Sequence, residues 1–133
     1  MSTEAKVEIR QESDILAARK IARTIATRLK FSEIDLILIA TAISEIARNI
    51  LTYATQGDMS FEEVQEPSRR GLIVTARDQG PGIPDIERAM EDGFSSGKGL
   101  GLGLPGARRL MDEFTIASTV GSGTTIVMKK WAK

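Results

Sequence analysis

Apolar residues recur with two different periods in the first half of the chain, and these periods predict one strand and two helices. Residues 5–10 alternate between apolar and charged side chains, which is typical of a half-buried strand. Ser13 is the expected N-cap of an amphipathic helix whose apolar positions lie three and four residues apart and which ends near residue 30. Ser32 and Asp35 resemble a capping box, and the helix that they open is predicted to end near residue 53.

Two hairpins are predicted in the second half of the chain. Residues 59–64 and 72–77 have the composition of strands, and the segment between them contains the turn signals Pro67, Ser68 and Gly71. Residues 116–120 and 124–128 form a second pair around the turn Gly121-Ser122-Gly123.

Helices are predicted between these hairpins, and the order of all elements predicts the fold class. A short helix is expected over residues 85–90, and a longer one from Pro105, with an apolar face made by Ala107, Leu110, Met111 and Phe114. Strands and helices segregate along the chain instead of alternating strictly. The order therefore predicts a two-layer α/β sandwich of the α+β class, in which one mixed, mainly antiparallel sheet is covered on one face by helices.

The composition predicts a single domain over residues 1–133 in a reducing compartment. Hydrophobic residues make up 41% of the chain and charged residues 27%, which is ordinary for a globular protein. The formal net charge is zero, so bulk charge favours neither nucleic acid nor a membrane surface as a partner. The absence of cysteine excludes disulfides and thiolate chemistry, and the charged N-terminal segment contains no apolar signal core. We expect a cytoplasmic protein.

A carboxylate and an amide on the helix of residues 32–53 are the first candidates for chemistry. The chain contains no histidine, so imidazole is excluded as a base, metal ligand or phosphate acceptor. Glu45 and Asn49 are four residues apart and lie within about 40° of each other around the helix axis. One interpretation is that Glu45 deprotonates an attacking hydroxyl while Asn49 offers an amide oxygen to Mg²⁺. The alternative is an exposed ion pair between Glu45 and Arg48, with Asn49 only solvated.

A second candidate lies at the end of the strand of residues 72–77, in the segment Asp78-Gln79-Gly80-Pro81-Gly82-Ile83. Its glycines allow the backbone to approach a flat ligand closely. An ionised Asp78 only accepts hydrogen bonds, so it pairs with the exocyclic amine of adenine and repels the carbonyl oxygen of guanine. This predicts ATP over GTP. The alternative is a tight turn in which Asp78 only accepts hydrogen bonds from nearby backbone N–H groups.

The third candidate is the glycine run Gly99-Leu100-Gly101-Leu102-Gly103-Leu104, which precedes the Pro105 helix. Successive backbone N–H groups and the partial positive charge of a helix N-terminus suit phosphates, and Lys98 adds a charge. Residues 101–106 match a dinucleotide fingerprint literally, but they follow a loop, and no acidic residue lies about twenty positions on. Residues 93–99 have three residues between glycines instead of the four of a P-loop. The alternative is an unligated loop.

Together these segments resemble the GHKL family of ATPases and kinases. Residues 45–49 are similar to its N box, residues 78–82 to its first glycine box and residues 99–104 to its second, while residues 121–125 resemble its last hairpin. The resemblance implies the Bergerat ATP-binding fold, with Glu45 as catalytic base and Asn49 as Mg²⁺ ligand. It implies nucleotide contacts from Asp78, Gly80, Gly82, Ile83, Lys98, Gly99, Leu100, Gly101, Leu102, Gly103 and Thr124.

Within that family the chain is most similar to serine kinases of the anti-sigma-factor type, and among these to the switch kinases of the stressosome. The similarity lies in residues 42–50, 78–85, 90–95, 103–106 and 109–114. It implies ATP-dependent phosphorylation of Ser or Thr in STAS-domain antagonist and scaffold proteins, and activation of a PP2C-type phosphatase. Two alternatives stay open: an anti-sigma factor kinase that sequesters a sigma factor, and a non-catalytic interaction module gated by nucleotide.

Overall fold

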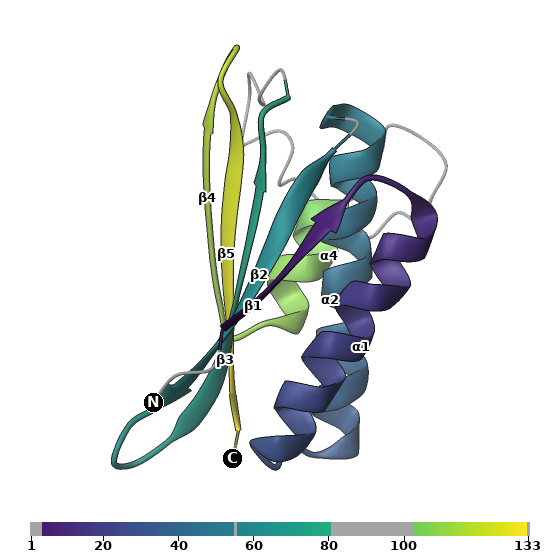
Figure 1. The fold of residues 1–133 in the computed structure, drawn as a ribbon. Coiled ribbons are helices and arrows are strands. Elements are labelled where there is room, and N and C mark those ends of the chain that lie inside the picture. Colours follow the sequence, from purple (N-terminus) through teal and green to yellow (C-terminus); the bar gives the residue numbers. More distant parts are fainter. Residues whose placement is uncertain (1–3, 55, 81–102, 133) are drawn as a thin grey trace.

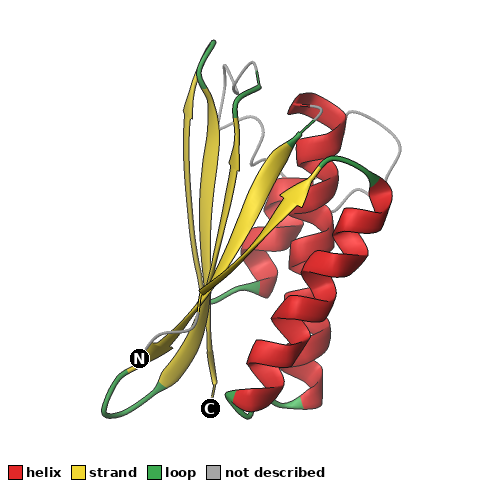
Figure 2. Ribbon diagram, in the orientation of Figure 1, coloured by secondary structure: helices red, strands yellow, loops and turns green. Residues whose placement is uncertain are grey.

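A five-stranded sheet with helices on one face forms the described part of the chain, which is residues 4–54, 56–80 and 103–132 of the computed structural model (Figure 1). Figure 2 shows strands in one layer and helices in the other. The elements in chain order are β1 (Glu4–Ile9), α1 (Glu12–Arg28), α2 (Glu33–Asn49), the π-helical turn η1 (Ile50–Ala54), β2 (Gly57–Gln65), β3 (Arg70–Asp78), α4 (Gly103–Leu110), β4 (Glu113–Thr119) and β5 (Gly123–Ala132).

The strand order is β1-β2-β3-β5-β4, and all described neighbours pair antiparallel. Burial alternates along β2 and β3, because successive side chains point to opposite faces of a sheet. The inner face packs on α1, α2 and α4 and supplies Met59, Phe61, Leu72 and Val74 to the core. This two-layer arrangement confirms the predicted α+β class.

The start of α1 corrects one prediction. Ser13 lies inside the helix, and Gln11 is the N-cap. The carboxylate of Asp14 accepts hydrogen bonds from the backbone N–H groups of Arg10 (2.8 Å) and Gln11 (3.1 Å). Because this carboxylate bonds back to the chain before the helix, the helix begins earlier than the serine indicated.

The second helix starts where the sequence predicted and ends differently. Ser32 is its N-cap and accepts a hydrogen bond from Asp35 N at 3.1 Å. The regular α-helix ends at Asn49, and the π-helical turn η1 continues the helical path to Ala54. Single π-turns are frequent at functional sites. Here the π-turn directly follows one of the candidate ligands.

The third predicted helix is shorter than expected. Its described part ends at Leu110, and Phe114 belongs to β4 instead of the helix. The backbone N–H of Asp112 donates to Lys129 O at 2.9 Å, so pairing with β5 begins where the helix was predicted to continue. The helix expected over residues 85–90 lies outside the described residues.

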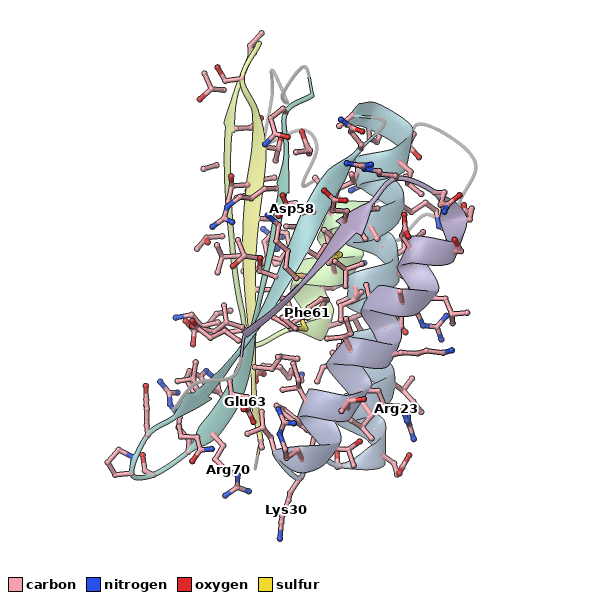
Figure 3. The ribbon with its side chains drawn as sticks, in the orientation of Figure 1. Arg23, Lys30, Asp58, Phe61, Glu63 and Arg70 are labelled. Carbon is pink, nitrogen blue, oxygen red and sulfur yellow. The ribbon has the colours of Figure 1, made fainter. Side chains whose placement is uncertain are left out.

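Charged side chains connect the two layers at the end of the sheet near the α1–α2 connection, where Figure 3 labels Glu63, Arg70 and Lys30. Glu63 is only 7% exposed, and its two carboxylate oxygens contact Arg28 of α1 at 3.3 Å. Arg70 Nε donates to Leu29 O at 3.1 Å. These contacts attach the C-terminal end of α1 to β2 and β3.

Trp131 lies on the outer face of the same end of the sheet. Its ring occupies the space above Gly71, where an added Cβ would lie 2.5 Å from Trp131 Cε3. The guanidinium carbon of Arg69 lies 3.6 Å from the ring centroid, and the indole N–H donates to Glu113 at 2.7 Å. The side chain therefore joins the β2–β3 hairpin to β5 and β4.

Candidate nucleotide-binding site

Asp78 lies where three strands meet at the opposite end of the sheet. As the last residue of β3, it is in register with Gly57, the first residue of β2, and with Thr124 near the start of β5. The carboxylate Oδ1 of Asp78 accepts a hydrogen bond from the backbone N–H of Gly80 at 2.9 Å. The tight-turn alternative is therefore correct as local geometry, and it leaves Oδ2 without a hydrogen bond in the described part of the chain.

Three glycines allow the backbone to pack closely around Asp78. A Cβ on Gly123 would lie 2.0 Å from Asp78 O, and one on Gly57 would lie 2.3 Å from Arg77 O. A Cβ on Gly80 would lie 2.6 Å from Ala54 Cβ, at the end of η1. Real Cβ atoms do not fit at such distances, so glycine is required at these three positions. Gly57 and Gly123 were not among the predicted site residues, because only the folded contacts reveal their role.

Asp78, Gly57, Gly80 and Gly123 together form the Asp78 corner. A pair of hydroxyls lies next to it. Thr124 is 8% exposed, and its Oγ1 is 2.9 Å from Ser118 Oγ on β4. Ser118 Oγ also donates to Gly123 O at 3.2 Å. Ser118 therefore holds the Thr124 hydroxyl in position beside Asp78. Sequence reasoning missed Ser118, because its only signal was its place in the last hairpin.

Glu45 and Asn49 lie on successive turns of α2, and both are half-buried. Glu45 is nine residues from Leu36, so it lies about 180° from the α1-facing side of the helix. α4 also packs against α2. Arg48, which the alternative interpretation paired with Glu45, instead contacts Glu12 of α1 at 3.2 Å.

The side-chain amide of Asn49 makes no hydrogen bond within the described residues. Those residues also contain no cluster of three or more acidic, histidine or cysteine side chains that suits a metal. One amide oxygen fits Mg²⁺ that is held mainly by nucleotide phosphates and water, since this ion keeps several waters and uses few protein ligands. The single amide oxygen of Asn49 thus suits a Mg²⁺ ion that binds together with the nucleotide.

The link between α2 and the Asp78 corner runs through η1. Ile50 Cγ2 lies 2.9 Å from the position of a Cβ on Gly57, and Ala54 contacts Gly80. The described contacts do not join Glu45 or Asn49 directly to Asp78. Gly103 is the first residue of α4, and the other predicted residues lie outside the described part: Gly82, Ile83, Lys98, Gly99, Leu100, Gly101 and Leu102.

Comparisons with known proteins agree with this arrangement. Residues 34–132 match the family model described as histidine kinase-, DNA gyrase B- and HSP90-like ATPase. The serine/threonine-protein kinase RsbT of Bacillus subtilis (strain 168) is 50% identical over 133 residues, which cover all of both chains. An anti-sigma F factor of Geobacillus stearothermophilus is 31% identical over 126 residues, covering 91% of this chain and 86% of the relative.

A solved structure supports the fold. The crystal structure of the RsbU and RsbW domains of a Mycobacterium tuberculosis protein superposes with a TM-score of 0.67 at 16% identity. The match covers 100% of this chain and 33% of the other, so this chain spans about a third of that protein's length. Among the described helices, each is too short or too polar to cross a membrane.

Proposed function

The chain belongs to the family of histidine kinase-, DNA gyrase B- and HSP90-like ATPases, and on this basis we propose that it is a partner-switching serine/threonine kinase. It binds ATP and transfers the γ-phosphate to Ser or Thr of STAS-domain antagonist and scaffold proteins. On release from them, it activates a PP2C-type phosphatase. The observation that carries the proposal is the full-length match to the Bacillus subtilis serine/threonine-protein kinase.

Glu45 is the proposed base of the transfer. The partner's hydroxyl oxygen forms a bond to the γ-phosphorus, the bond from that phosphorus to the leaving ADP oxygen breaks, and the hydroxyl proton passes to the Glu45 carboxylate. Such chemistry needs mainly alignment and charge neutralisation. A positioned base contributes about 10²- to 10⁴-fold.

Recognition of ATP is assigned to the Asp78 corner. Asp78 Oδ2 is available to the adenine amine because the turn uses Oδ1, and Thr124 adds a hydroxyl held by Ser118. Glycine-run N–H groups and Lys98 are proposed to hold the phosphates. Asn49 would hold Mg²⁺, which supplies charge neutralisation on the phosphates when bound.

Incubation with radiolabelled ATP, Mg²⁺ and STAS-domain proteins tests the kinase assignment directly. The wild-type chain should label the STAS protein, and Glu45→Ala should lower the transfer rate by about 10²-fold or more while keeping ATP affinity. Glu33→Ala is a matched control, since this exposed carboxylate lies three turns away on the same helix. Near wild-type transfer by Glu45→Ala would show that the base is wrong.

Sequestration of a sigma factor is a second candidate, favoured by the relatives named anti-sigma F factor. It predicts a stable complex between this chain and a sigma factor in the presence of nucleotide. Size-exclusion chromatography of the mixed proteins separates the two functions, because the partner-switching kinase should elute apart from sigma. ATP-dependent binding of partners without any transfer would instead indicate a gated interaction module.

A further inference from the structure

A groove lies between α1 and α2 on the outer side of the helical layer. Its volume is about 150 Å³, and buried Ala22 and Ile39 contribute to its floor. Small-molecule sites usually measure about 300–1,000 Å³, so this groove suits an anchoring side chain of a larger partner better than a cofactor. Leu16, Arg19, Lys20 and Arg23 of α1 line it together with Leu36 and Ala40 of α2.

The surface around the groove is more apolar than its sequence indicates. Leu16 lines the groove and is 52% exposed, and Ile37, about 60° around α2 from the lining residue Ala40, is 62% exposed. The hydroxyl groups of Thr41 and Ser44 donate to helix carbonyls one turn earlier, each at 2.9 Å. The hydroxyl protons of both side chains are thus used within α2.

Three cations border this apolar surface without local compensation. Arg19, Lys20 and Arg23 are exposed, and within the described residues none of their side chains forms an ion pair or hydrogen bond. The groove lining contains no carboxylate. Figure 3 shows Arg23 on the side of α1 away from the sheet. Since the whole chain has zero formal charge, this cluster is a local excess that complements an acidic partner.

The position of the groove separates it from phosphate transfer. Leu36 lines it, whereas Glu45 lies about 180° away around α2. A segment held in the groove therefore lies on a different side of α2 from the proposed base. This placement fits a partner that is activated instead of phosphorylated.

We propose that the α1–α2 groove binds an acidic amphipathic helix of the PP2C-type phosphatase, an inference that rests on the proposed partner-switching function. Apolar side chains of that helix enter the groove beside Leu16 and Ile37, as in helix-in-groove recognition. Its carboxylates face Arg19, Lys20 and Arg23. The groove thus serves activation of the phosphatase, while the Asp78 corner and Glu45 serve phosphate transfer.

Charge reversal tests the groove with a matched control. The variant Arg19→Glu/Arg23→Glu should weaken binding of the phosphatase, measured by isothermal titration, by about tenfold or more, because like charges then face each other. Wild-type affinity should fall as salt is raised. ATP affinity and labelling of STAS proteins should stay within about twofold of wild type, because neither residue lies in the proposed transfer site. The control Arg10→Glu/Lys129→Glu makes the same charge change outside the groove and should bind normally.

A photo-crosslinker in place of Leu16 identifies the occupant. We expect it to label an acidic helix of the phosphatase. Unchanged affinity of the double variant, labelling of a non-acidic segment, or absence of phosphatase binding by the wild type would overturn the proposal. Binding to phosphatidylglycerol vesicles that competes with the phosphatase would also overturn it. If the wild-type chain did not label STAS proteins, that result would instead contradict the kinase assignment.

Discussion

The two carboxylate oxygens of Asp78 differ in their contacts. Oδ1 fixes the turn through Gly80 N, and this bond orients the side chain before any ligand arrives. Oδ2 lacks a hydrogen bond among the described residues. An ionised carboxylate offers about four acceptor positions, so one group can serve both the fold and the ligand.

Replacement of Asp78 by Asn separates the turn contact from the proposed adenine contact. The amide oxygen can still accept from Gly80 N, so the free energy of unfolding should change by only about 1 kcal/mol or less. The amide NH₂ then faces the adenine amine, and two donors oppose each other. ATP affinity in isothermal titration should fall at least about tenfold, because an interacting acceptor has become an unpaired donor. Equal affinity for the variant and the wild type would contradict the adenine assignment.

The sequence motif alone nominates Asp78 as the proposed adenine ligand, but it does not reveal the contacts that support this residue. Local sequence indicated a turn at residues 78–82, and the structure contains the Asp78–Gly80 part of it. Gly57 and Gly123 lie far from that motif in the chain, and their contacts depend on strand register. Register is fixed by long-range pairing, which single-sequence patterns do not specify.

At the scale of elements, alternation predicted the strands and helical periodicity predicted the helices, while boundaries depended on competing interactions. Helix α1 begins earlier than predicted, because the Asp14 carboxylate accepts a hydrogen bond from the backbone N–H of Gln11, before Ser13. Strand pairing of Asp112 ended the third helix before Phe114. Both the start of α1 and the end of the third helix are thus set by a hydrogen bond, and helix propensity along the sequence contains no information about such bonds.

The turn between β4 and β5 contains two glycines that provide a controlled comparison. Gly121 has a φ of 84° and open space around it, whereas Gly123 has a φ of 109° and contacts Asp78. Gly121→Ala should cost about 1–2 kcal/mol through backbone strain alone. Gly123→Ala should cost more in denaturant unfolding and should also weaken ATP binding, because Thr124 and Asp78 must separate. Equal losses for both variants would show that the close contact is unimportant.

For the whole molecule, the contact between layers is uneven along the sheet. The end near the α1–α2 connection is tied by Arg28, Glu63 and Arg70, with Glu63 almost fully buried. The opposite end brings Asp78, Gly80 and Ala54 together. The sandwich therefore has a charged structural end and a candidate ligand-binding end, a division that the sequence did not reveal because Arg28 and Glu63 are 35 residues apart.

Removal of Arg28 tests the structural end. Arg28→Ala removes the two contacts that Arg28 makes with the buried Glu63 carboxylate, and the free energy of unfolding should fall by about 1–3 kcal/mol. Arg10→Ala is the control, since its pair with Glu8 is exposed and should contribute about 0.5 kcal/mol or less. Chemical denaturation measures both. ATP affinity should remain unchanged in the folded Arg28→Ala protein, because the two ends are separate.

The position of Trp131 gives this protein an intrinsic optical probe. It is the sole tryptophan of the chain, and its neighbours Arg69, Gly71 and Glu113 come from different segments of the sheet. Strand register sets it seven residues from Thr124 along β5, roughly 23 Å at 3.3 Å per residue. Its emission therefore reports the integrity of the sheet at a distance from the proposed nucleotide site, so unfolding can be followed by fluorescence without direct interference from bound nucleotide.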